Sequence, residues 1–394
     1  MPAKDGLPDG MSAEGKDPAA LRTHGWSLFQ LVWENVSAHR FKPLWYTWCT
    51  DAEMFDPQTP VDCTGSRARD LDQDSRMRGL QVRSGNTSAY PSLPLLPNVI
   101  SGVYISPSLA KYIQGLPASF KPPIPVPSGE TYSDIGDALY SALLKNNVQA
   151  LPQGPSDEVV IKVAWAEVPC PNSPNSPPPS IPAWDGTLPS GPPAHLDPST
   201  FPKVYIDPQS LARKQCKPDP NVKVPDGQHA FKRDDFFWFQ KISNDQFTSI
   251  PGLNPQPGSY LMLVAMHIIT HEQKDWVWAT YWLSTPTDTG HRAGKPAALQ
   301  SGKGAPFAMD ISVSEEKPIY NPFLEGKQEG FEQGNCMRCH RAASVFRSPD
   351  NGKLICNVPS NDAEPGPGLK PGVVQTSFLW TLARRATNFC AGSN

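Results

Sequence analysis

Apolar residues recur at two spacings along the chain, and the wider spacing, close to 3.6 residues, predicts helices. Leu, Phe, Val and Trp fall at this spacing over 21–38, where an amphipathic helix is expected. A second helix is expected over 132–148, with Ser133 as its N-cap. A last helix is expected over 376–389. The helical pattern is therefore confined to a few segments.

Alternation of apolar and polar residues, the narrower spacing, predicts strands over 158–168 and 203–206. The strongest hairpin signal is the pair 260–270 and 276–284, joined by the polar loop 271–275. The second hairpin strand presents two faces: Trp276, Trp278 and Trp282 on one, and Val277, Ala279 and Tyr281 on the other. Such a tryptophan row either belongs to a two-layer core or walls a bound planar group.

Proline is unusually frequent, with 46 residues in a chain of 394. This share is more than twice the usual ~5%, and proline is excluded from helix interiors and central strands. Residues 39–130 are aromatic and interrupted by proline, so only short elements are expected there. Residues 170–198 and 285–330 are predicted to be long loops. Much of the chain is therefore expected to wrap as loop over a smaller framework.

Together these patterns predict an α+β fold with a loop-rich, proline-rich body, an antiparallel β-sheet built around the hairpin, and few helices. Three regions are expected along the chain. Residues 1–20 form a flexible arm, and residues 21–330 form the body. Residues 331–394 form a short, helical C-terminal portion packed on that body.

The charge and hydropathy of the chain exclude two kinds of partner. The formal net charge is −3 and no basic stripe is present, so nucleic acid is not an expected partner. The longest apolar run, 260–269, is too short to span a membrane, so no transmembrane segment is expected. The first 20 residues lack a hydrophobic signal core. An exported form would therefore have lost its signal peptide before this N-terminus.

The segment Cys336-Met337-Arg338-Cys339-His340 has the spacing of a c-type haem attachment site. Two thiols three positions apart on a helical turn reach the two vinyl groups of one haem. The adjacent imidazole then lies beneath the iron as its proximal ligand. The motif therefore predicts one covalent haem c, bound by Cys336, Cys339 and His340, in a periplasmic or secreted protein.

Two other chemistries also use paired cysteines. A zinc site would need Cys356 and Cys390 as further ligands, but these do not form a second close pair. A thioredoxin-like dithiol would need a βαβ setting, which the predicted elements do not provide. Haem attachment is the interpretation that the spacing favours.

Six cysteines remain outside the motif, and six permit 15 disulfide connectivities. The oxidising compartment implied by haem attachment favours disulfides over buried thiols. Pairing between sequence neighbours is expected: Cys49–Cys63, Cys170–Cys216 and Cys356–Cys390.

No methionine or histidine follows His340, so the other side of the iron is closed by an upstream residue or is open. His267 is the first candidate, because strand alternation places it on an apolar face with Leu261, Leu263 and Ala265. A core histidine bonded to backbone is an equally ordinary interpretation. The other candidates are His271, expected to be solvated on the hairpin loop, Met262 and Met266 on the opposite strand face, Met309 in a loop, His24 and His291.

Segments spread over most of the chain, in the same order, resemble a widespread group of bacterial proteins with a single c-type haem site. The resemblance is carried by the helix with Trp26, Phe29 and Trp33, by Trp45-Tyr46-Thr47-Trp48, by Ala164-Trp165, by 263–268, by 276–281 and by 336–340. It implies one integrated haem protein, with histidine usual at the position of His267, and brings no established activity. This chain has Thr270, His271 and Glu272 where the group tends to carry a His-Lys pair, so no role of the hairpin loop is carried over.

Three classes of function fit one covalent haem. The first is a redox protein that transfers electrons to or from a partner protein; no dinucleotide-binding turn or nucleophile elbow is present. The second is a haem enzyme of peroxidase or oxidase type, with a small-molecule substrate at an open distal site built from the loops. The third is a haem-based sensor or binding protein. The optical spectrum with and without carbon monoxide distinguishes the first two.

Overall fold

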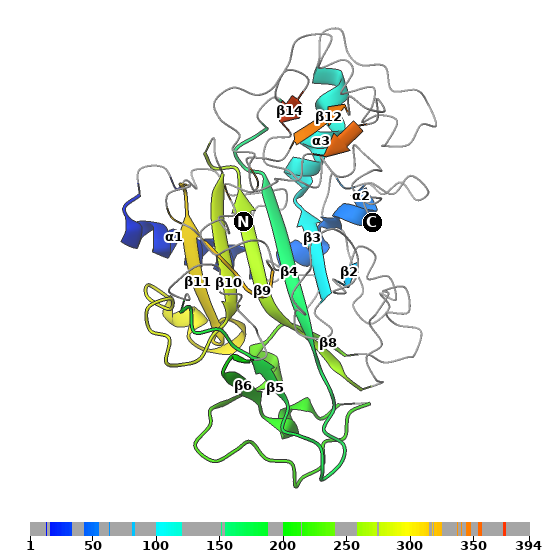
Figure 1. Ribbon diagram of the computed structural model, residues 1–394, viewed down its shortest axis with the longest axis vertical. Coiled ribbons are helices and arrows are strands. Elements are labelled where there is room, and N and C mark those ends of the chain that lie inside the picture. The colour runs from blue at the N-terminus through cyan, green and yellow to red at the C-terminus, as the bar shows by residue number, and fades with distance from the viewer. Residues whose placement is uncertain are drawn as a thin grey trace.

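The computed structural model shows a chain organised around one large antiparallel sheet (Figure 1). The residues that it describes are 13, 16–33, 43–54, 63, 81–82, 100–119, 151, 154–187, 200–213, 215–240, 258–273, 276–314, 317, 319–324, 337, 340, 344–347, 354–356 and 373–375. Eight strands form the sheet in the order β1-β3-β4-β9-β10-β11, with β2 paired to β3 and β8 to β9. Their bounds are β1 Cys49–Thr50, β2 Gln81–Val82, β3 Ile100–Ile105, β4 Val159–Val168, β8 Trp238–Gln240, β9 Tyr260–Thr270, β10 Val277–Leu283 and β11 Phe307–Ser312. The predicted α+β class and antiparallel sheet are confirmed.

The hairpin at the centre of the sheet is the one that the sequence predicts. β9 and β10 pair antiparallel, from Thr270 opposite Val277 to Ala265 opposite Trp282. β4 pairs with the other side of β9 and lies within the strand expected over 158–168. Every residue of β9 and β10 is buried. The continuous apolar run of β9 therefore reflects cover on both faces of the sheet.

One face of the sheet is covered by α1, Pro18–Trp33, and is called the helix face. Phe29 packs on Tyr281 of β10 with ring centroids 4.7 Å apart, and the Tyr281 hydroxyl donates to the Gly25 carbonyl oxygen at 2.5 Å. Further aromatic residues extend this packing across the sheet: Trp33, Trp45, Tyr104, Trp165 and Phe237. The predicted N-terminal helix is thus present and amphipathic.

The opposite face, called the loop face, carries the other set of alternating side chains. Strand register places Trp278, Thr280 and Trp282 of β10 on it together with His267 of β9. Lys162 of β4 lies opposite His267 and therefore on the same face. The predicted separation of Trp278 and Trp282 from Tyr281 is confirmed, because Tyr281 meets α1 on the helix face.

A β-bulge changes which side chains accompany His267. The register between β4 and β9 shifts between Ala164 and Trp165, so that Ala164 lies opposite Ala265 but Trp165 lies opposite Leu263. Ala265 shares the face of His267, as predicted. Leu261 and Leu263 lie on the helix face, and their predicted position was wrong because one extra residue reverses the alternation.

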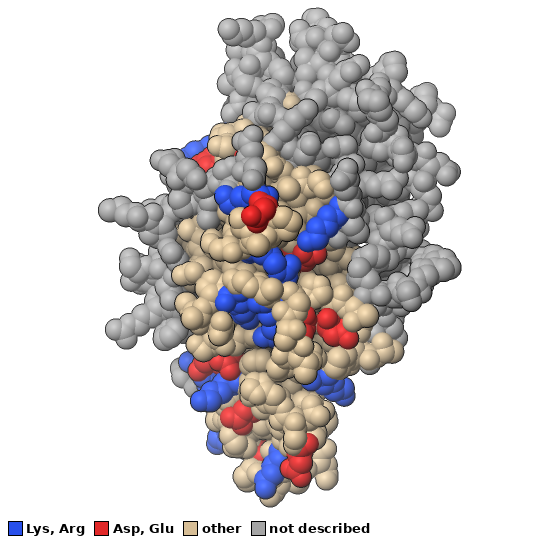
Figure 2. Space-filling view, turned by 90° about the vertical axis from the view of Figure 1, so that its left-hand side faces the viewer, with Lys and Arg blue, Asp and Glu red and all other residues tan. Residues whose placement is uncertain are grey.

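β11 is an edge strand, and its outer edge is occupied by side chains and by the turn before it. Three basic side chains donate to its outward carbonyl oxygens: Lys295 to Phe307 at 2.8 Å, Arg22 to Met309 at 3.0 Å and Lys317 to Ile311 at 3.1 Å. The Met309 amide donates to the His291 carbonyl oxygen at 3.0 Å. Figure 2 views the molecule from this side and shows Lys and Arg gathered over the middle of the face. Unpaired edges invite pairing with another chain, and these contacts block it.

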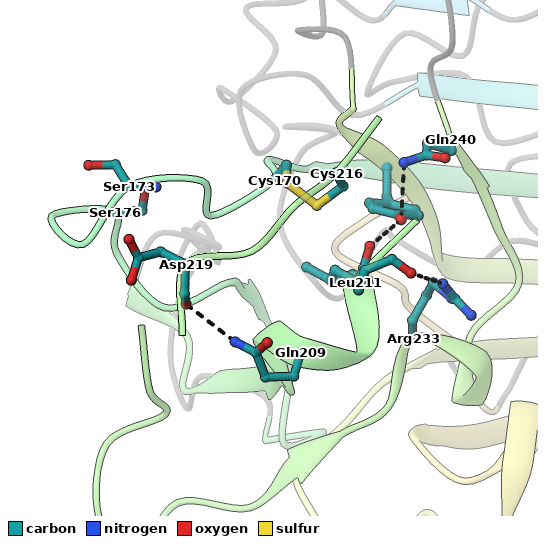
Figure 3. The surroundings of a disulfide bond; sticks show 11 residues. Cys170, Ser173, Ser176, Gln209, Leu211, Cys216, Asp219, Arg233 and Gln240 are labelled. Atoms are coloured by element: carbon teal, nitrogen blue, oxygen red, sulfur yellow. Dashed lines mark hydrogen bonds between the residues drawn. A yellow bond between two sulfur atoms is a disulfide. The ribbon is translucent and has the colours of Figure 1, made fainter. Parts of the chain in front are cut away.

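Two disulfides tether the loops, and both match the predicted pairing. Cys49–Cys63 has its Cα atoms 5.6 Å apart. Cys170–Cys216, with Cα atoms 5.5 Å apart, joins the loop after β4 to the segment before β8 (Figure 3). The predicted pair Cys356–Cys390 lies outside the described residues.

Two three-stranded sheets accompany the large one. The first, at the lower end of Figure 1, consists of β5 Ser180–Pro182, β6 Lys203–Ile206 and β7 Ala230–Phe231. β6 coincides with the strand predicted over 203–206. The second consists of β12 Ser344–Arg347, β13 Leu354–Cys356 and β14 Val373–Gln375. The sequence predicts a helical portion for 331–394. Within it the structure describes Met337 and His340 as helical and 344–347, 354–356 and 373–375 as strands. The helix predicted over 376–389 lies outside the described residues.

Three elements appear where the sequence predicts only short elements or loop: β3, β11 and α3, Pro107–Ser119. Pro107 opens α3, and the Ser106 hydroxyl oxygen accepts from the Leu109 amide at 3.4 Å as an N-cap. The remaining described helices are short: α2 Asp51–Met54, η1 Leu44–Thr47, η3 Pro208–Leu211, η4 Arg233–Asp235, η5 Ala297–Leu299 and η6 Gly302–Gly304. The helix predicted over 132–148 lies outside the described residues. Within the described chain, no helix is both long and apolar enough to cross a bilayer.

Candidate haem-binding site

The described part of the 336–340 motif lies against the loop face of the sheet. The Met337 side chain is buried. The His340 ring is partly exposed and packs on the Trp278 indole, with ring centroids 4.5 Å apart and planes inclined by 58°. Cys336, Arg338 and Cys339 lie outside the described residues. The structure therefore places the predicted proximal histidine against the central hairpin.

Trp278 and Trp276 have different roles, although the sequence placed them on one face. Trp278 lies within β10 on the loop face and contacts His340. Trp276 precedes β10 with a φ of 62°, a conformation rare for a bulky residue. Its indole stacks on the His271 ring, with centroids 4.6 Å apart and planes inclined by 18°. Trp276 therefore closes the hairpin loop and does not extend the tryptophan row.

His267 points into the interior of the loop face, as predicted, and only 5% of it is exposed. It occupies the centre of a row formed with Lys162 of β4 and Thr280 of β10. Residues 319–324, called the cover segment, bond to both ends of this row. The Asn321 amide donates to the Thr280 hydroxyl oxygen at 2.8 Å, and Lys162 Nζ donates to the Leu324 carbonyl oxygen at 3.1 Å. The cover segment therefore crosses the row that contains His267.

His267 is also a neighbour of the residue that holds His340. It lies opposite Thr280, two residues along β10 from Trp278. Such diagonal neighbours on one face of a sheet are separated by roughly 7 Å. The structure thus brings His267 and His340 to the same region of the loop face, and iron ligation by His267 stays a prediction.

His271 is buried, and the expectation that it is solvated was wrong. Its Nδ1 lies 3.0 Å from Glu158 Oε2 and 3.1 Å from the Pro155 carbonyl oxygen. The hairpin loop folds back onto β4, and this places His271 over the start of that strand. Burial raises the pKa of Glu158, and the hydrogen bond to His271 opposes this rise in part.

His24, a lesser candidate, is buried on the helix face. Its Nε2 lies 2.8 Å from Glu272 Oε2, and the Thr270 hydroxyl donates to Glu272 Oε1 at 2.7 Å. This cluster joins α1 to the end of β9. Burial raises the pKa of the neighbouring Tyr281, and the charge of Glu272 raises it further. His24 is therefore paired with Glu272 in a structural contact, on the face of the sheet opposite His340.

The candidate methionines are all buried within strands. Met262 and Met266 lie in β9 and Met309 in β11, none of them with measurable exposure. The prediction that Met309 lies in a loop was wrong. Its thioether packs on α1, where a Cβ added at Gly25 would lie 3.0 Å from the Met309 sulfur. Met309 is thus part of the contact between α1 and the helix face.

His291 lies on the turn after β10, and its ring rests on the loop face. It packs edge-on against Trp282, with ring centroids 5.2 Å apart. Its Nδ1 lies 3.1 Å from Asp288 Oδ1, while the Ser284 hydroxyl donates to Asp288 Oδ2 at 2.7 Å. Burial alone would raise the pKa of Asp288, but hydrogen bonds from His291 and Ser284 outweigh it and lower the pKa. The sequence names His291 only as a minor candidate. Asp288, three residues before it, is the local pattern that could have pointed to this pair.

The described loop-face residues beside His340 are mainly aromatic and apolar. Among the described residues, no group of three or more His, Cys, Asp or Glu side chains is arranged to hold a metal ion. Haem iron needs few protein ligands, because the porphyrin supplies four nitrogens. Aromatic and apolar side chains of the loop face, Trp278, Trp282 and Ile269, suit the surface of a porphyrin.

Comparison of the chain with protein-family models, with curated proteins and with solved structures found no match. The functional assignment therefore depends on the residues of this chain and their contacts.

Proposed function

We propose that this chain is an extracytoplasmic redox protein that transfers electrons through one covalent haem c attached at 336–340. The observation that carries the proposal is the contact of His340 with Trp278, together with the burial of Met337. A motif on a detached tail would leave a haem exposed to water on both sides. A motif against the loop face would give a bound haem an apolar wall built from the body.

Each residue of the site has a defined task in this proposal. Cys336 and Cys339 provide the thioether bonds, and His340 supplies the proximal nitrogen. Trp278 packs on the imidazole ring and restricts its orientation toward the iron. Bound haem would supply a one-electron couple, and burial together with ligand orientation would set its potential.

The two disulfides support a location outside the cytoplasm. Cys49–Cys63 and Cys170–Cys216 are both formed. Disulfides persist in oxidising compartments, where c-type haem attachment also takes place. Disulfides and covalent haem attachment are both expected in a periplasmic or secreted protein.

An electron-transfer protein and a haem enzyme differ in the state of the iron. In a carrier, the iron is six-coordinate and low-spin, and carbon monoxide does not displace its ligands readily. In an enzyme of the peroxidase or oxidase type, one position is open to a small molecule. The large loop-rich body is the feature that keeps the enzyme as a second candidate.

The test uses the full chain, exported and matured with its haem. Ferric and ferrous optical spectra are recorded with and without carbon monoxide, and the haem is titrated potentiometrically. The proposal expects a low-spin spectrum, a reversible one-electron couple and little response to carbon monoxide. A high-spin ferric spectrum with immediate carbon monoxide binding would contradict electron transfer and favour the enzyme.

A further inference from the structure

Glu158 and His271 form a buried acid–imidazole pair at the start of β4. Their side chains are 1% and 4% exposed, and His271 Nδ1 lies 3.0 Å from Glu158 Oε2. The same nitrogen lies 3.1 Å from the Pro155 carbonyl oxygen, which can only accept, so Nδ1 carries a hydrogen. Within the described chain, the buried Glu158 Oε1 has no hydrogen-bond partner and His271 Nε2 forms no hydrogen bond. The pair therefore has two unused atoms that can hold a further proton.

The charge of the pair favours binding that proton. With His271 neutral and Glu158 ionised, one unbalanced negative charge is buried, and an added proton removes it. Burial raises the pKa of Glu158; the hydrogen bond and the charge of His271 oppose this rise, and the charge of Asp157 adds to it. Tyr112 of α3 also lies near, and burial and the Glu158 charge raise its pKa. Trp276 stacks on the His271 ring, and an indole face attracts a cation.

The other buried Glu–His pair, between Glu272 and His24, has a different arrangement. Both carboxylate oxygens of Glu272 lie within 3.0 Å of His24 Nε2, and the Thr270 hydroxyl donates to one of them. In Glu158, only Oε2 meets the imidazole, and Oε1 packs against the Gly154 backbone. A buried oxygen without a partner is costly in a contact that only joins two elements. A proton-binding role explains why such an oxygen is retained.

Strand alternation places the Glu158–His271 pair on the loop face. Glu158 lies four residues before Lys162, and His271 lies four residues after His267. Lys162 and His267 are opposite each other on this face. The His271 amide donates to the Glu158 carbonyl oxygen at 3.0 Å, so the pairing of β4 with β9 extends to the pair. An even number of residues separates each member from the loop-face row, so both share that face.

The pair is consequently close to the proposed haem. Trp278, which packs on the His340 ring, lies opposite Ile269, two residues before His271. Two residues span roughly 7 Å along a strand. The strands β12 and β14, which follow the haem motif, lie at the same end of the molecule as α3 (Figure 1). In a protein, a unit charge about 12 Å from a titrating group shifts its titration by roughly one pH unit. Reduction of the iron adds one negative charge and so favours the protonated pair.

We propose that Glu158 and His271 form a proton-binding site coupled to the haem, so that the electron that reduces ferric iron is accompanied by up to one proton from solvent. This inference rests on the proposed function. The electron comes from the redox partner protein, and the proton is held by the pair as one coupled unit, at Glu158 Oε1 or His271 Nε2. Oxidation releases both. Because the ferrous protein binds more protons, the midpoint potential falls as the pH rises through the titration of the pair.

The experiment measures the midpoint potential of the full, haem-loaded chain from acid to mildly alkaline pH, together with proton uptake on reduction in unbuffered solution. Wild type is expected to show a potential that falls over a window of roughly one pH unit, with proton uptake in the same window. Glu158→Gln and His271→Asn each remove one titrating group and should abolish the fall and the uptake. Asp157→Asn is the matched control, because it removes the same charge one residue away. It should keep the fall, moved to lower pH, since Asp157 raises the pKa of Glu158.

The outcomes separate this inference from the proposed function. If the wild-type chain carries no covalent haem, the proposed function fails. If haem is attached and reversibly reduced but its potential does not change with pH, the inference is overturned and the haem assignment stands. A fall that is the same in folded Glu158→Gln and His271→Asn as in wild type belongs to another group, such as the haem propionates, and also overturns it. If neither variant folds, Glu158→Asp decides, because it keeps the acid but shortens its reach to His271 Nδ1. A titration window that moves supports the coupling, and an unmoved window contradicts it.

Discussion

The helix face and the loop face of the central sheet bury histidines in different ways. On the helix face, His24 is inaccessible, with both its partner Glu272 and the adjoining Thr270 engaged in the same cluster. On the loop face, His267 is buried as well, but His340 and His291 are partly exposed, and each of these two rings packs on a tryptophan. The first arrangement joins elements together. The second fixes imidazoles while leaving them accessible, which is what a ligand site requires.

The comparison predicts that the largest stability effect comes from the helix face. Trp45 is fully buried and its ring contacts Tyr104, Trp165 and Phe237. Trp45→Ala should lower the free energy of unfolding by about 3–5 kcal/mol, because a large cavity remains. Urea unfolding measures this loss. The haem spectrum of the folded variant should match wild type, whereas Trp278→Ala should change the spectrum. Equal spectral changes in both variants would contradict the view that the loop face, and not the helix face, contacts the haem.

The buried pair of His24 and Glu272 provides the next largest effect. His24→Ala leaves the Glu272 carboxylate buried, and among the described residues the Thr270 hydroxyl is then its remaining hydrogen-bond partner. The free energy of unfolding should fall by about 3 kcal/mol. Replacing both partners, as His24→Leu with Glu272→Met, should recover most of that loss, since no buried charge is then left unpaired. A double variant as unstable as the single one would show that packing, not charge, dominates this site.

Lys295 gives a smaller, pH-dependent effect. It is buried, and burial together with the nearby charge of Arg292 lowers the pKa of Lys295 to about 7. An unfolded lysine titrates near ~10.4, so between these values the unfolded chain binds more protons than the folded chain. The free energy of unfolding should therefore rise with pH from about 7 to about 10. Below pH 7 both states are protonated, and Lys295 contributes no slope.

Chemical unfolding at several pH values measures this slope. Lys295→Met removes the titrating group and should flatten the rise. Because burial also lowers the pKa of Lys303, part of the rise should remain in the variant. A slope identical to wild type would show that Lys295 keeps an ordinary pKa in the folded protein.

The smallest effect on stability is expected at the edge of β11. Lys317 is half-exposed, and it donates a hydrogen bond to the Ile311 carbonyl oxygen on the solvent side of the strand edge. Lys317→Ala should change the free energy of unfolding by less than about 1 kcal/mol. Combined with Arg22→Ala, it should promote self-association, because an uncapped edge strand can pair with another chain. Sedimentation at increasing concentration detects this, and a strictly monomeric double variant would contradict the role of the cations.

Much of the framework follows from local sequence patterns. The strand β4 and the helix α1 have long periodic patterns, β9 and β10 are long apolar runs joined by a polar loop, and two disulfides pair sequence neighbours. β3 and β11 are only six residues long and lie in proline-rich surroundings, so pairing with distant strands, rather than local pattern, decides them. The bulge at Ala164 and Trp165 leaves no mark in the sequence, and it reversed the predicted faces of Leu261 and Leu263.

In the candidate site, too, some features follow from the local sequence and others depend on distant contacts. The 336–340 motif can be recognised in the sequence because the proposed haem attachment requires that spacing. The choice among upstream histidines is not local, because it depends on contacts such as that of His271 with Glu158, more than 100 residues away in the chain. The expectation of a solvated His271 failed for this reason. The contacts that hold the His291 ring, with Asp288, Trp282 and Gly186, likewise become visible only in the three-dimensional structure.

The most direct measurement is a pyridine haemochrome spectrum of the full chain, exported and purified under denaturing conditions that remove any non-covalent haem. The account predicts c-type bands for the wild-type protein and for His291→Ala, and their loss when Cys336 and Cys339 are both replaced by Ala. A wild-type chain produced together with an active haem-attachment system and lacking these bands would contradict the central claim.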